Sequence, residues 1–497
     1  MWVDVTDMVV VRNVISTVRA GGPRQLSEIR SEFMVEITDF QAVDDVLSEL
    51  DSIGLDGRSF NNIPLIKAEP QETISEVISS VSNFVRNIPE EGALMDLSRA
   101  DGVVETTSNI IESTRGVLSY ISDLAGVVSV SFVRTLSDFG PENLRASPFE
   151  MRTLTEDDYH IEDSTQGELM SNLEMERVWN MTEGENAIIA VFDTGYAEGL
   201  ISENRIVGEF HGGDTNSVYA PEEAHGAMVV GAAAANADDG VPYDGIAKGS
   251  DIIYVRITDD SGAIRTDIIN EGWDWLLERD GDRPIVTNHS YGMPICNSRP
   301  RFNECQSPDA DAVRLANSTP YMTSVYAAGN EAGTCGRRLS GLTSGITGIN
   351  SLAEVITVGA LRFDMLDGQR YTSHGRGDCS PISDPKPNVS CALPQKLYSS
   401  DEDGWKVKDM GAPFGGSFGG TSTASPYVAG KIALLQSKAM DRRGEPLQTE
   451  ELKQIIHKAA EPPRRTQVNS LPGITARGWD ARFGHGQINI LEALREV

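Results

Sequence analysis

The stretch GGTSTASPYVAG, Gly419–Gly430, places two glycines and a serine directly before an apolar run, 427–439, that predicts a buried helix. Ser422 lies at the beginning of that helix, where the positive end of the helix dipole favours developing negative charge. The glycines leave room for another molecule beside the hydroxyl. Small residues before an apolar helix also occur for close packing, so the stretch indicates chemistry only if partners for the serine lie elsewhere.

Three upstream segments supply such partners. The strand-like run 187–192 ends at Asp193, His225 precedes a small-residue helical stretch, and the apolar run 321–326 leads to Asn330. A serine is a weak nucleophile, so it needs an imidazole to take its proton and a carboxylate to orient that imidazole. A side-chain amide can stabilise the oxyanion. The sequence therefore predicts Ser422 as nucleophile, His225 as base, Asp193 as its orienting acid and Asn330 as oxyanion donor.

Four sequence blocks together resemble the subtilisin-like serine proteases, or subtilases. They are DTG at 193–195, HGxxVxG at 225–231, AGN at 328–330 and GTSxAxP at 420–426. The order Asp, His, Ser is the one known for subtilisin itself. Further agreement comes from blocks at 285–292, 355–360, 386–389 and 483–489. The resemblance implies an α/β fold, a mostly parallel sheet with helices on both faces and the site at the carboxyl ends of the strands.

Each site residue also has a plainer interpretation. Asp193 lies two residues before Gly195 and Asn330 directly follows Gly329, and turn residues are common in such places. Other histidines lie beside serines or glycines and are alternative bases: His211, His289, His374 and His485. Only His225 occupies the position of the base in the family. The joint presence of all four groups favours catalysis over four separate turns.

The resemblance implies a serine endopeptidase that hydrolyses polypeptides through an acyl-enzyme. Ser290, Tyr291 and Gly292 are expected to form one backbone edge that pairs with an extended substrate. Ser261, Gly262 and Ala263 are expected to form the opposite edge, or else a plain surface turn.

Beside Asn330, Glu331 is a candidate for the rim of the specificity pocket, favouring a basic or large residue before the cut. The alternative to an enzyme is a binding or structural protein, such as a virion component, on a protease scaffold. That alternative requires a lost catalytic residue, and none of the four is missing.

The region 1–135 predicts a smaller α+β domain. It shows strands at 33–37, 63–68 and 126–133 with helices at 41–53 and 118–124. This order resembles the ferredoxin-like propeptide of subtilases, which implies that the domain acts as folding chaperone and inhibitor of its own enzyme. An insertion of amphipathic helices, about 71–115, is expected either to pack on itself or to bind a partner.

The acidic stretch 136–166 is the expected linker, followed by the catalytic domain, 167–497. Self-cleavage inside the linker would make the chain a zymogen. The alternative is an N-terminal domain that stays attached as a permanent docking domain.

The composition is strongly acidic. The net charge is −32 and the pI is about 4.6, and only 10 of the 42 basic residues are lysines. Like charges repel, which argues against nucleic-acid partners and anionic membranes. Salt screens the self-repulsion of such a surface, so we expect a halophilic source rather than an ordinary acidic enzyme.

All five cysteines fall in the catalytic region: Cys296, Cys305, Cys335, Cys379 and Cys391. The nearest pair is Cys296 with Cys305, and the resemblance to some secreted subtilases implies Cys335 with Cys379. A Cys379–Cys391 pair remains open. One thiol stays unpaired in each scheme. Bridges indicate an oxidising compartment, and the spacing does not suggest zinc.

A turn after His225 offers hard oxygen ligands from Asn236, Asp238 and Asp239, which suit Ca²⁺. Relatives bind calcium in the corresponding loop, although acids are abundant throughout this chain. No organic cofactor is expected.

The first residues include Asp4 and Asp7 and do not resemble a signal peptide, and no apolar run of about 18 residues predicts a membrane span. We expect an extracellular or virion-associated protein if another route exports it or its leader is missing from this sequence, and a cytoplasmic one otherwise.

Overall fold

The computed structural model divides the chain into two compact units, 1–133 and 134–497, which are described separately. The residues that it describes are 33–37, 40–52, 55–70, 127–132, 135–138, 166–212, 217–219, 225–239, 243–259, 262–279, 281–292, 304–330, 346, 348–361, 377, 379–381, 383–393, 396–401, 404–409, 420–463 and 478–497. The predicted insertion at 71–115, the helix at 118–124 and most of the predicted linker lie outside them.

The N-terminal unit contains a four-stranded antiparallel sheet in the order β2-β3-β1-β4. Its elements are β1 (Phe33–Ile37), η2 (Phe40–Ala42), α2 (Val43–Ser52), β2 (Leu55–Ser59), β3 (Leu65–Pro70) and β4 (Val127–Phe132). Val35 on the central β1 lies opposite Ile66 and Val130, and Val46 and Leu50 of α2 are buried. The sequence analysis missed β2, whose residues LDGRS are too polar to predict a strand.

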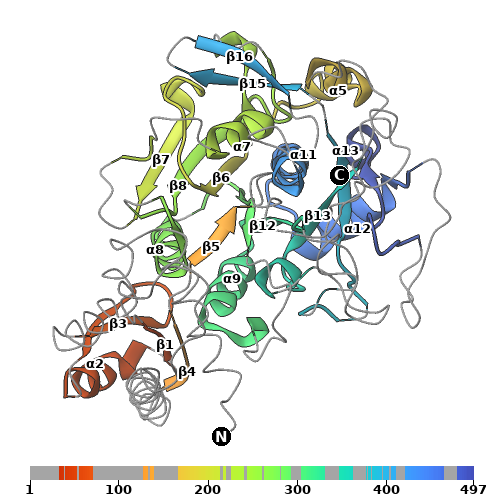
Figure 1. Ribbon diagram of the computed structural model, residues 1–497. Coiled ribbons are helices and arrows are strands. Elements are labelled where there is room, and N and C mark those ends of the chain that lie inside the picture. Colours follow the sequence, from red (N-terminus) through yellow and green to blue (C-terminus); the bar gives the residue numbers. More distant parts are fainter. Residues whose placement is uncertain are drawn as a thin grey trace, which may run out of the picture. The chain divides into compact units, whose positions relative to one another are not determined.

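The larger unit is built on a nine-stranded sheet in the order β17-β18-β14-β13-β12-β10-β6-β8-β7 (Figure 1). Its strands are β6 (Ile188–Asp193), β7 (Ile206–His211), β8 (Asp251–Arg256), β10 (Ile285–His289), β12 (Met322–Ala327), β13 (Ile356–Leu361), β14 (Val389–Ala392), β17 (Ala460–Glu461) and β18 (Gln487–Ile488). All neighbours are parallel except β17 and β18. The central strands are almost wholly buried, as expected for parallel strands covered on both faces.

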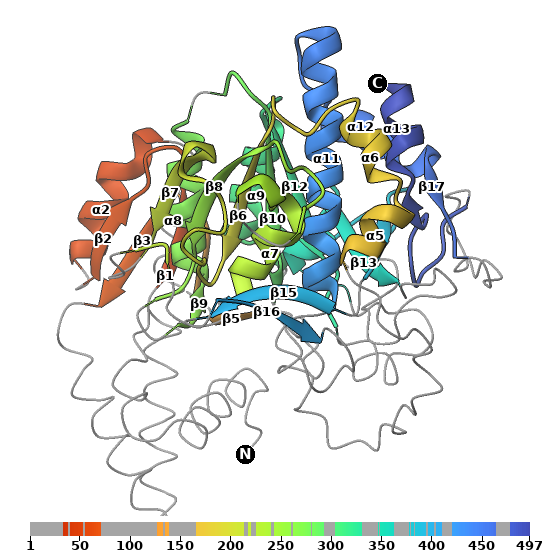
Figure 2. The ribbon, with the colours of Figure 1, turned by 90° about the horizontal axis from the view of Figure 1, so that it is seen from above.

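Helices cover both faces of this sheet (Figure 2). They are α5 (Gln166–Asn172), α6 (Met175–Trp179), α7 (His225–Ala234), α8 (Thr266–Leu277), α9 (Pro308–Ser318), α11 (Thr421–Arg443), α12 (Thr449–Lys458) and α13 (Ile490–Glu496). Ile189 and Val191 of β6 share a core with α7 and α11, whereas Phe192 lies against Trp273 of α8, with the ring centroids 4.7 Å apart and the rings tilted by 35°. The expected α/β fold with helices on both faces is therefore confirmed.

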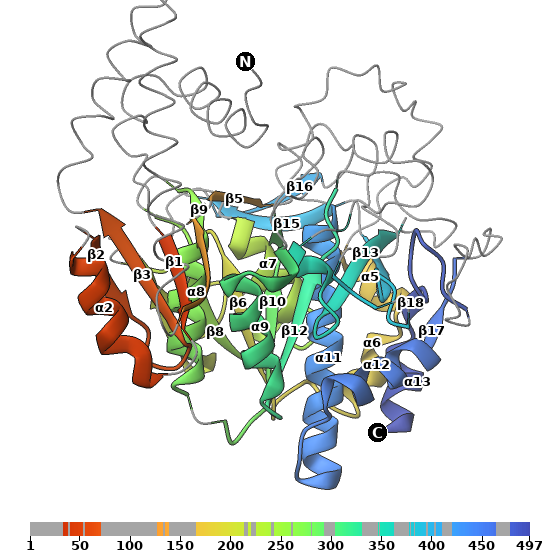
Figure 3. The ribbon, with the colours of Figure 1, turned by 90° about the horizontal axis from the view of Figure 1, so that it is seen from below.

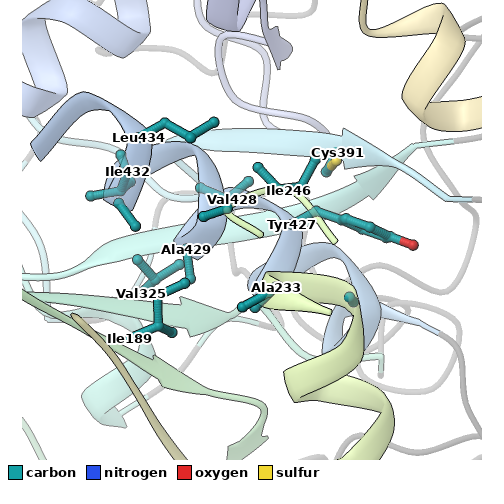
Figure 4. Close-up of a cluster of buried hydrophobic side chains, with 14 of the residues drawn as sticks. Ile189, Ala233, Ile246, Val325, Cys391, Tyr427, Val428, Ala429, Ile432 and Leu434 are labelled. Carbon is teal, nitrogen blue, oxygen red and sulfur yellow. The ribbon is translucent and has the colours of Figure 1, made fainter. Parts of the chain in front are cut away.

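The long helix α11 anchors the core (Figure 4). Val428 and Ala429 pack with Ile189 and Val325 of the sheet and with Ala233 of α7. The helix begins after Gly420 and ends at Gly444, whose left-handed conformation is typical of a helix C-terminus. Its position fixes where Ser422 lies relative to the strand ends.

Short elements complete the unit. They are β5 (Thr135–Asp138), η6 (Glu203–Arg205), η7 (Ala237–Asp239), β9 (Ile264–Arg265), β11 (Tyr291–Gly292), η8 (Glu304–Gln306), η9 (Gly348–Ser351) and the hairpin of β15 (Lys396–Asp401) and β16 (Gly404–Asp409). No helix among the described residues has the length and hydropathy to cross a bilayer.

The disulfide pairing differs from every pairing predicted. Cys305, in η8, is bonded to Cys379, and Cys391 on β14 is a buried free thiol. The predicted pairs Cys296–Cys305, Cys335–Cys379 and Cys379–Cys391 are therefore wrong. The bond closes a loop of 74 residues, and its partners meet only because α9 and η9 pack together, which local spacing does not reveal.

Candidate active site

Asp193 and His225 are in direct contact. Asp193 ends β6, His225 begins α7, and the Nδ1 atom of His225 lies 2.8 Å from Oδ1 of Asp193, with both side chains buried. The same oxygen accepts a hydrogen bond from the backbone N–H of Thr194 at 2.7 Å. An imidazole whose Nδ1 donates to a carboxylate has its other nitrogen available as a base.

Glycine at position 226 permits this contact. A Cβ atom there would lie 2.3 Å from the carbonyl oxygen of Gly195 and 2.9 Å from Cβ of Asp193. Real Cβ atoms do not approach backbone so closely, so any side chain at 226 would push α7 away from the end of β6. The glycine of the HG block is thus explained by packing against the DTG turn.

Ser422 lies in the first turn of α11, buried, at the same edge of the sheet. Its Oγ atom donates to the carbonyl oxygen of Ser290 at 3.2 Å, and Oγ of Ser290 donates to the carbonyl oxygen of Ser422 at 3.0 Å. The helix α11 packs against α7, which His225 begins, and β10, which precedes Ser290, pairs with β6, which Asp193 ends.

Asn330 is held by the residue before the serine. Its side-chain oxygen accepts from the backbone N–H of Thr421 at 3.0 Å and from the Thr421 hydroxyl at 3.1 Å. A Cβ atom on Gly420 would lie 2.5 Å from Nδ2 of Asn330, so a glycine is required where this amide passes. With its oxygen fixed by Thr421, the amide presents its N–H₂ group, which is the donor end.

A second chain of hydrogen bonds ties α11 to β10. Ser425 donates to the side-chain oxygen of Asn288 at 2.7 Å, and Asn288 donates to Oγ of Ser290 at 3.1 Å. All three are buried and, through Ser290, they reach Ser422. The sequence analysis assigned no role to Ser425 or Thr421, although both lie within the stretch 420–426. Hydroxyl side chains in a segment predicted to be buried were the signal that could have indicated hydrogen bonding there.

The two segments predicted to pair with substrate have different structures. Tyr291 and Gly292 form β11, which pairs with β5, but the strand on the opposite side is β9, Ile264–Arg265. Gly262 and Ala263 instead lie in a tight turn closed by Asp259, whose backbone and carboxylate bind both. The turn alternative therefore describes these two residues, whereas Ser261 and Glu331 fall outside the described residues.

His289, the last residue of β10, is a buried structural residue. It is fully buried, its ring stacks on Tyr326 with centroids 4.1 Å apart, and Nδ1 lies 2.8 Å from the Tyr291 hydroxyl. Burial lowers the pKa of His289 well below its usual value, which keeps the ring neutral. The ring of His485 stacks on that of His457, with centroids 4.1 Å apart. His211 is exposed at the end of β7, and His374 lies outside the described residues.

The side chains predicted to bind calcium do not fit that ion. Asp239 binds the guanidinium of Arg205 at 3.0 Å, and the side-chain oxygen of Asn236 accepts from the backbone N–H of Asp238. Arg205 also donates to the carbonyl oxygens of Ala234 and Ser250. The guanidinium of Arg205 thus neutralises Asp239, where the ion was expected. The described residues contain no group of three or more His, Cys, Asp or Glu side chains that could hold a metal.

Comparisons with known proteins agree with this geometry. The model of the subtilase family matches residues 184–486. The chain is 28% identical over 267 residues to an intracellular serine protease of Paenibacillus polymyxa, covering 53% of this chain and 70% of that one. It is 23% identical to a calcium-dependent protease of Nostoc, covering 71% of this chain but 53% of the relative.

It is also 27% identical to subtilisin E of Bacillus subtilis over 256 residues, 51% of this chain and 56% of that protein. Among solved structures, fervidolysin of Fervidobacterium pennivorans, a keratinolytic enzyme related to subtilisin, matches with a TM-score of 0.52 and 19% identity. That match covers 94% of this chain and 61% of fervidolysin, and it supports the fold alone.

Proposed function

The chain belongs to the subtilase family of serine endopeptidases, and we propose that it cleaves polypeptides with Ser422 as nucleophile. The observation that carries the proposal is the hydrogen bond between Asp193 and His225 at the sheet edge where α11 presents Ser422. A serine without a base nearby would not be activated.

In the proposed mechanism, Oγ of Ser422 attacks the carbonyl carbon of the substrate while His225 takes the hydroxyl proton. The Oγ atom donates to the Ser290 carbonyl in the structure, so its hydrogen turns toward His225 before transfer. The C–N bond then breaks as His225 passes the proton to the departing amine. Water, deprotonated by the same imidazole, releases the acyl group, and Asp193 keeps the ring in the required tautomer throughout.

Asn330 is assigned the role of stabilising the negative charge on the oxygen of the tetrahedral intermediate. Thr421 holds the oxygen of this amide, which turns the Nδ2 donor toward the serine side of the site. The backbone N–H of Ser422, in the first turn of α11, is the second donor. Fixed donors of this kind stabilise the transition state without reorganisation.

The direct test is hydrolysis of an unfolded polypeptide such as casein. The protein expressed from the full sequence should cleave it once processed, and Ser422→Ala should not, although both show the cooperative thermal unfolding of a folded catalytic unit. Equal activity in the two proteins would refute the assignment of the nucleophile.

We also propose that the N-terminal unit is a propeptide that assists folding and blocks the site until it is cut. The strand order β2-β3-β1-β4 with α2 after β1 supports a ferredoxin-like domain. Its expected second helix falls in the part of the chain outside the described residues. The proposed boundaries remain 1–135 for this domain, 136–166 for the linker and 167–497 for the catalytic domain.

Two further properties are proposed from charge and sulfur chemistry. The net charge of −32 supports adaptation to high salt, which is tested by measuring activity from dilute buffer to molar NaCl. Full activity and stability in dilute buffer would refute it. The Cys305–Cys379 bond supports folding in an oxidising compartment and hence export of the protein.

A further inference from the structure

The carboxylate that orients His225 is held mainly by the residue that follows it. Asp193 ends β6, which lies beside β8 in the sheet (Figure 3). Its Oδ1 atom, 2.8 Å from Nδ1 of His225, also accepts hydrogen bonds from the backbone N–H of Thr194 at 2.7 Å and from the Thr194 hydroxyl at 3.2 Å. The geometry of the Asp193–His225 pair therefore depends on where Thr194 is held.

Thr194 is in turn held through its carbonyl oxygen. The hydroxyl of Thr258, a residue that is 1% exposed, donates to that oxygen at 3.2 Å. The same hydroxyl accepts a hydrogen bond from Nε of Arg256 at 3.0 Å. A hydroxyl has one hydrogen and a guanidinium can only donate, so the hydrogen of Thr258 is directed at Thr194. Arg256 thus fixes the direction in which Thr258 donates.

Arg256 also reaches the other side of the turn that follows β6. Its Nη1 atom donates to two carbonyl oxygens of the segment 217–219, those of Ser217 at 3.0 Å and Tyr219 at 3.4 Å. The carbonyl oxygen between these two accepts a hydrogen bond from the backbone N–H of Tyr196 at 3.2 Å. A guanidinium presents its donors at fixed angles, so this single group braces the turn from two sides.

The segment 256–258 borders strand β9 as well as the turn. The backbone N–H of Ile257 donates to the carbonyl oxygen of Asp193 at 3.0 Å, and the carbonyl oxygen of Ile257 accepts from the backbone N–H of Arg265 at 3.3 Å. The backbone of the segment therefore joins β9 to β6. The side chains of Arg256 and Thr258 make their hydrogen bonds to each other, to the turn and to the segment beside it.

We propose that Arg256 and Thr258 are positioning residues for the catalytic carboxylate, an inference that rests on the proposed function. By fixing the carbonyl group of Thr194, they keep both donors of Thr194 on Oδ1 of Asp193. The carboxylate then holds the imidazole of His225 in the orientation that proton transfer requires. Both residues act through Thr194 and not on the reacting atoms.

The principal test is peptide hydrolysis by Thr258→Val and Thr258→Ser, each expressed from the full sequence and processed. Thr258→Val keeps the shape of the side chain but loses both hydrogen bonds, so kcat should fall about 10- to 100-fold, as expected when a catalytic group is slightly misplaced. KM should stay within about twofold, because the imidazolium forms only after substrate has bound. Thr258→Ser keeps the hydroxyl and should retain kcat within about threefold.

The division between kcat and KM separates this role from a purely structural one. If residue 258 only supported β9, Thr258→Val would raise KM and leave kcat unchanged, and that result would overturn the proposal. Equal losses of kcat in Thr258→Val and Thr258→Ser would also overturn it, because the hydroxyl would then not matter.

Arg256→Lys is a second test that leaves Thr258 in place. It keeps the positive charge but cannot brace both sides of the turn, so kcat should fall at least about fivefold. Arg283→Lys is the matched control, because Arg283 pairs with Asp251 at the other end of β8, and kcat should stay within about twofold. Full activity in Arg256→Lys would show that its charge alone suffices and would refute the bracing role.

A spectroscopic signature reports the pair itself. In the Ser422→Ala background, the proton between His225 and Asp193 should give a far-downfield ¹H resonance, identified by its loss in Asp193→Asn. Thr258→Val should move this resonance upfield, because the hydrogen bond lengthens, whereas Arg283→Lys should leave it in place. An unmoved resonance in folded Thr258→Val would overturn the proposal.

Failure of the inference is distinguishable from failure of the proposed function. A wild type that hydrolyses peptides and labels with a fluorophosphonate probe, beside a Thr258→Val variant with the same kcat, refutes the positioning role alone. A folded wild type that neither hydrolyses nor labels refutes the proposed function, and the inference falls with it.

Discussion

Two buried polar networks lie in the catalytic unit, and their difference shows what marks an active site. The first joins Ser425, Asn288, Ser290 and Ser422 where β10 meets the beginning of α11. Its last member is a hydroxyl beside the strand edge that pairs with β5. The hydrogen bonds of this network therefore orient side chains beside that strand edge.

The second network surrounds Asp384 before β14. Nζ of Lys386 donates to the carbonyl oxygen of Val355 at 2.7 Å and lies 3.2 Å from Asp384, which also binds Lys453 of α12 at 2.8 Å. Burial opposes ionisation of Asp384, but the two lysines outweigh it and lower its pKa. This network closes on backbone carbonyls and fastens α12 to the sheet.

Perturbed titration alone would select the wrong network. Burial, followed by the charge of Lys453, lowers the pKa of Lys386 to about 7, the range of a catalytic lysine. The ammonium group of Lys386, however, contacts Val355, Asn388 and Asp384 and is not directed at the strand edge that pairs with β5. The first network differs because it ends on Ser422, the proposed nucleophile, next to the strand edge that pairs with β5.

The largest expected effect is in the first network. Ser422→Ala should lower kcat by on the order of 10⁶-fold, the loss that removal of the nucleophile causes in the relative subtilisin. Asp193→Asn should lower it by on the order of 10⁴-fold, because the imidazole then adopts the wrong tautomer. Steady-state hydrolysis of a chromogenic peptide measures both. A loss of less than tenfold in either variant would contradict the assigned roles.

Asn330→Ala should lower kcat by about 10² to 10³-fold, the magnitude known for loss of an oxyanion donor in subtilisin. KM should change little, because the donor acts on charge that develops in the transition state. Thr421→Val is the matched positioning variant, and it should lower kcat less than Asn330→Ala because the amide oxygen loses one of its two hydrogen bonds while the amide keeps its donor. A change confined to KM would refute the oxyanion role.

The stacked rings of His457 and His485 should make the C-terminal part of the unit sensitive to acid. Burial, followed by the charge of His485, lowers the pKa of His457 to about 3, and burial lowers that of His485 to about 4. The folded rings stay neutral while the unfolded chain takes up protons below about pH 6.5. Stability is thus fully present above that pH and falls as the pH drops toward 4, by up to about 1.4 kcal/mol per pH unit for each ring.

Urea unfolding between pH 7 and 4.5 measures that slope. His457→Gln should flatten it, and the exposed His211→Gln should leave it unchanged. An unchanged slope in His457→Gln would show that the stacked pair does not carry the acid sensitivity.

In the second network, Lys386→Met should cost about 2 kcal/mol of stability, because the carbonyl of Val355 loses its donor and Asp384 keeps only one lysine. The folded fraction should retain kcat within about threefold. Parallel urea unfolding and peptide hydrolysis test this. A folded Lys386→Met variant with a hundredfold lower kcat would show that the second network also contributes to catalysis, contrary to the structural role assigned to it.

The smallest expected effect is that of chelation. Because Arg205 neutralises Asp239, EDTA should shift Tm of the wild type by no more than about 2 °C. Arg205→Met, by contrast, should cost about 2 kcal/mol, since Asp239 and the carbonyls of Ala234 and Ser250 lose their donors. A large EDTA effect on wild type, reversed by Ca²⁺, would show that calcium stabilises the enzyme elsewhere.

The sequence predicted what local patterns encode. The apolar strand before Asp193 and the small residues around Ser422 leave few alternatives to buried strand and helix. The mostly parallel sheet was expected from the resemblance to the subtilases. Partners that meet only through tertiary packing were not predictable, such as Arg205 with Asp239 or Cys305 with Cys379. The sequence analysis expected an edge at 261–263, whereas the strand β9 begins at Ile264. Asp259 closes a turn over Gly262 and Ala263, and no sequence periodicity predicts that contact.

The central claim is that Ser422 is the activated nucleophile of this chain. The most direct measurement is labelling of the folded protein, expressed from the full sequence and freed of its N-terminal unit, by a fluorophosphonate probe, followed by peptide mass mapping. The account predicts one modified serine, Ser422, and strongly reduced labelling in Asp193→Asn. Modification of another serine, or a folded wild-type protein that takes up no label, would contradict it.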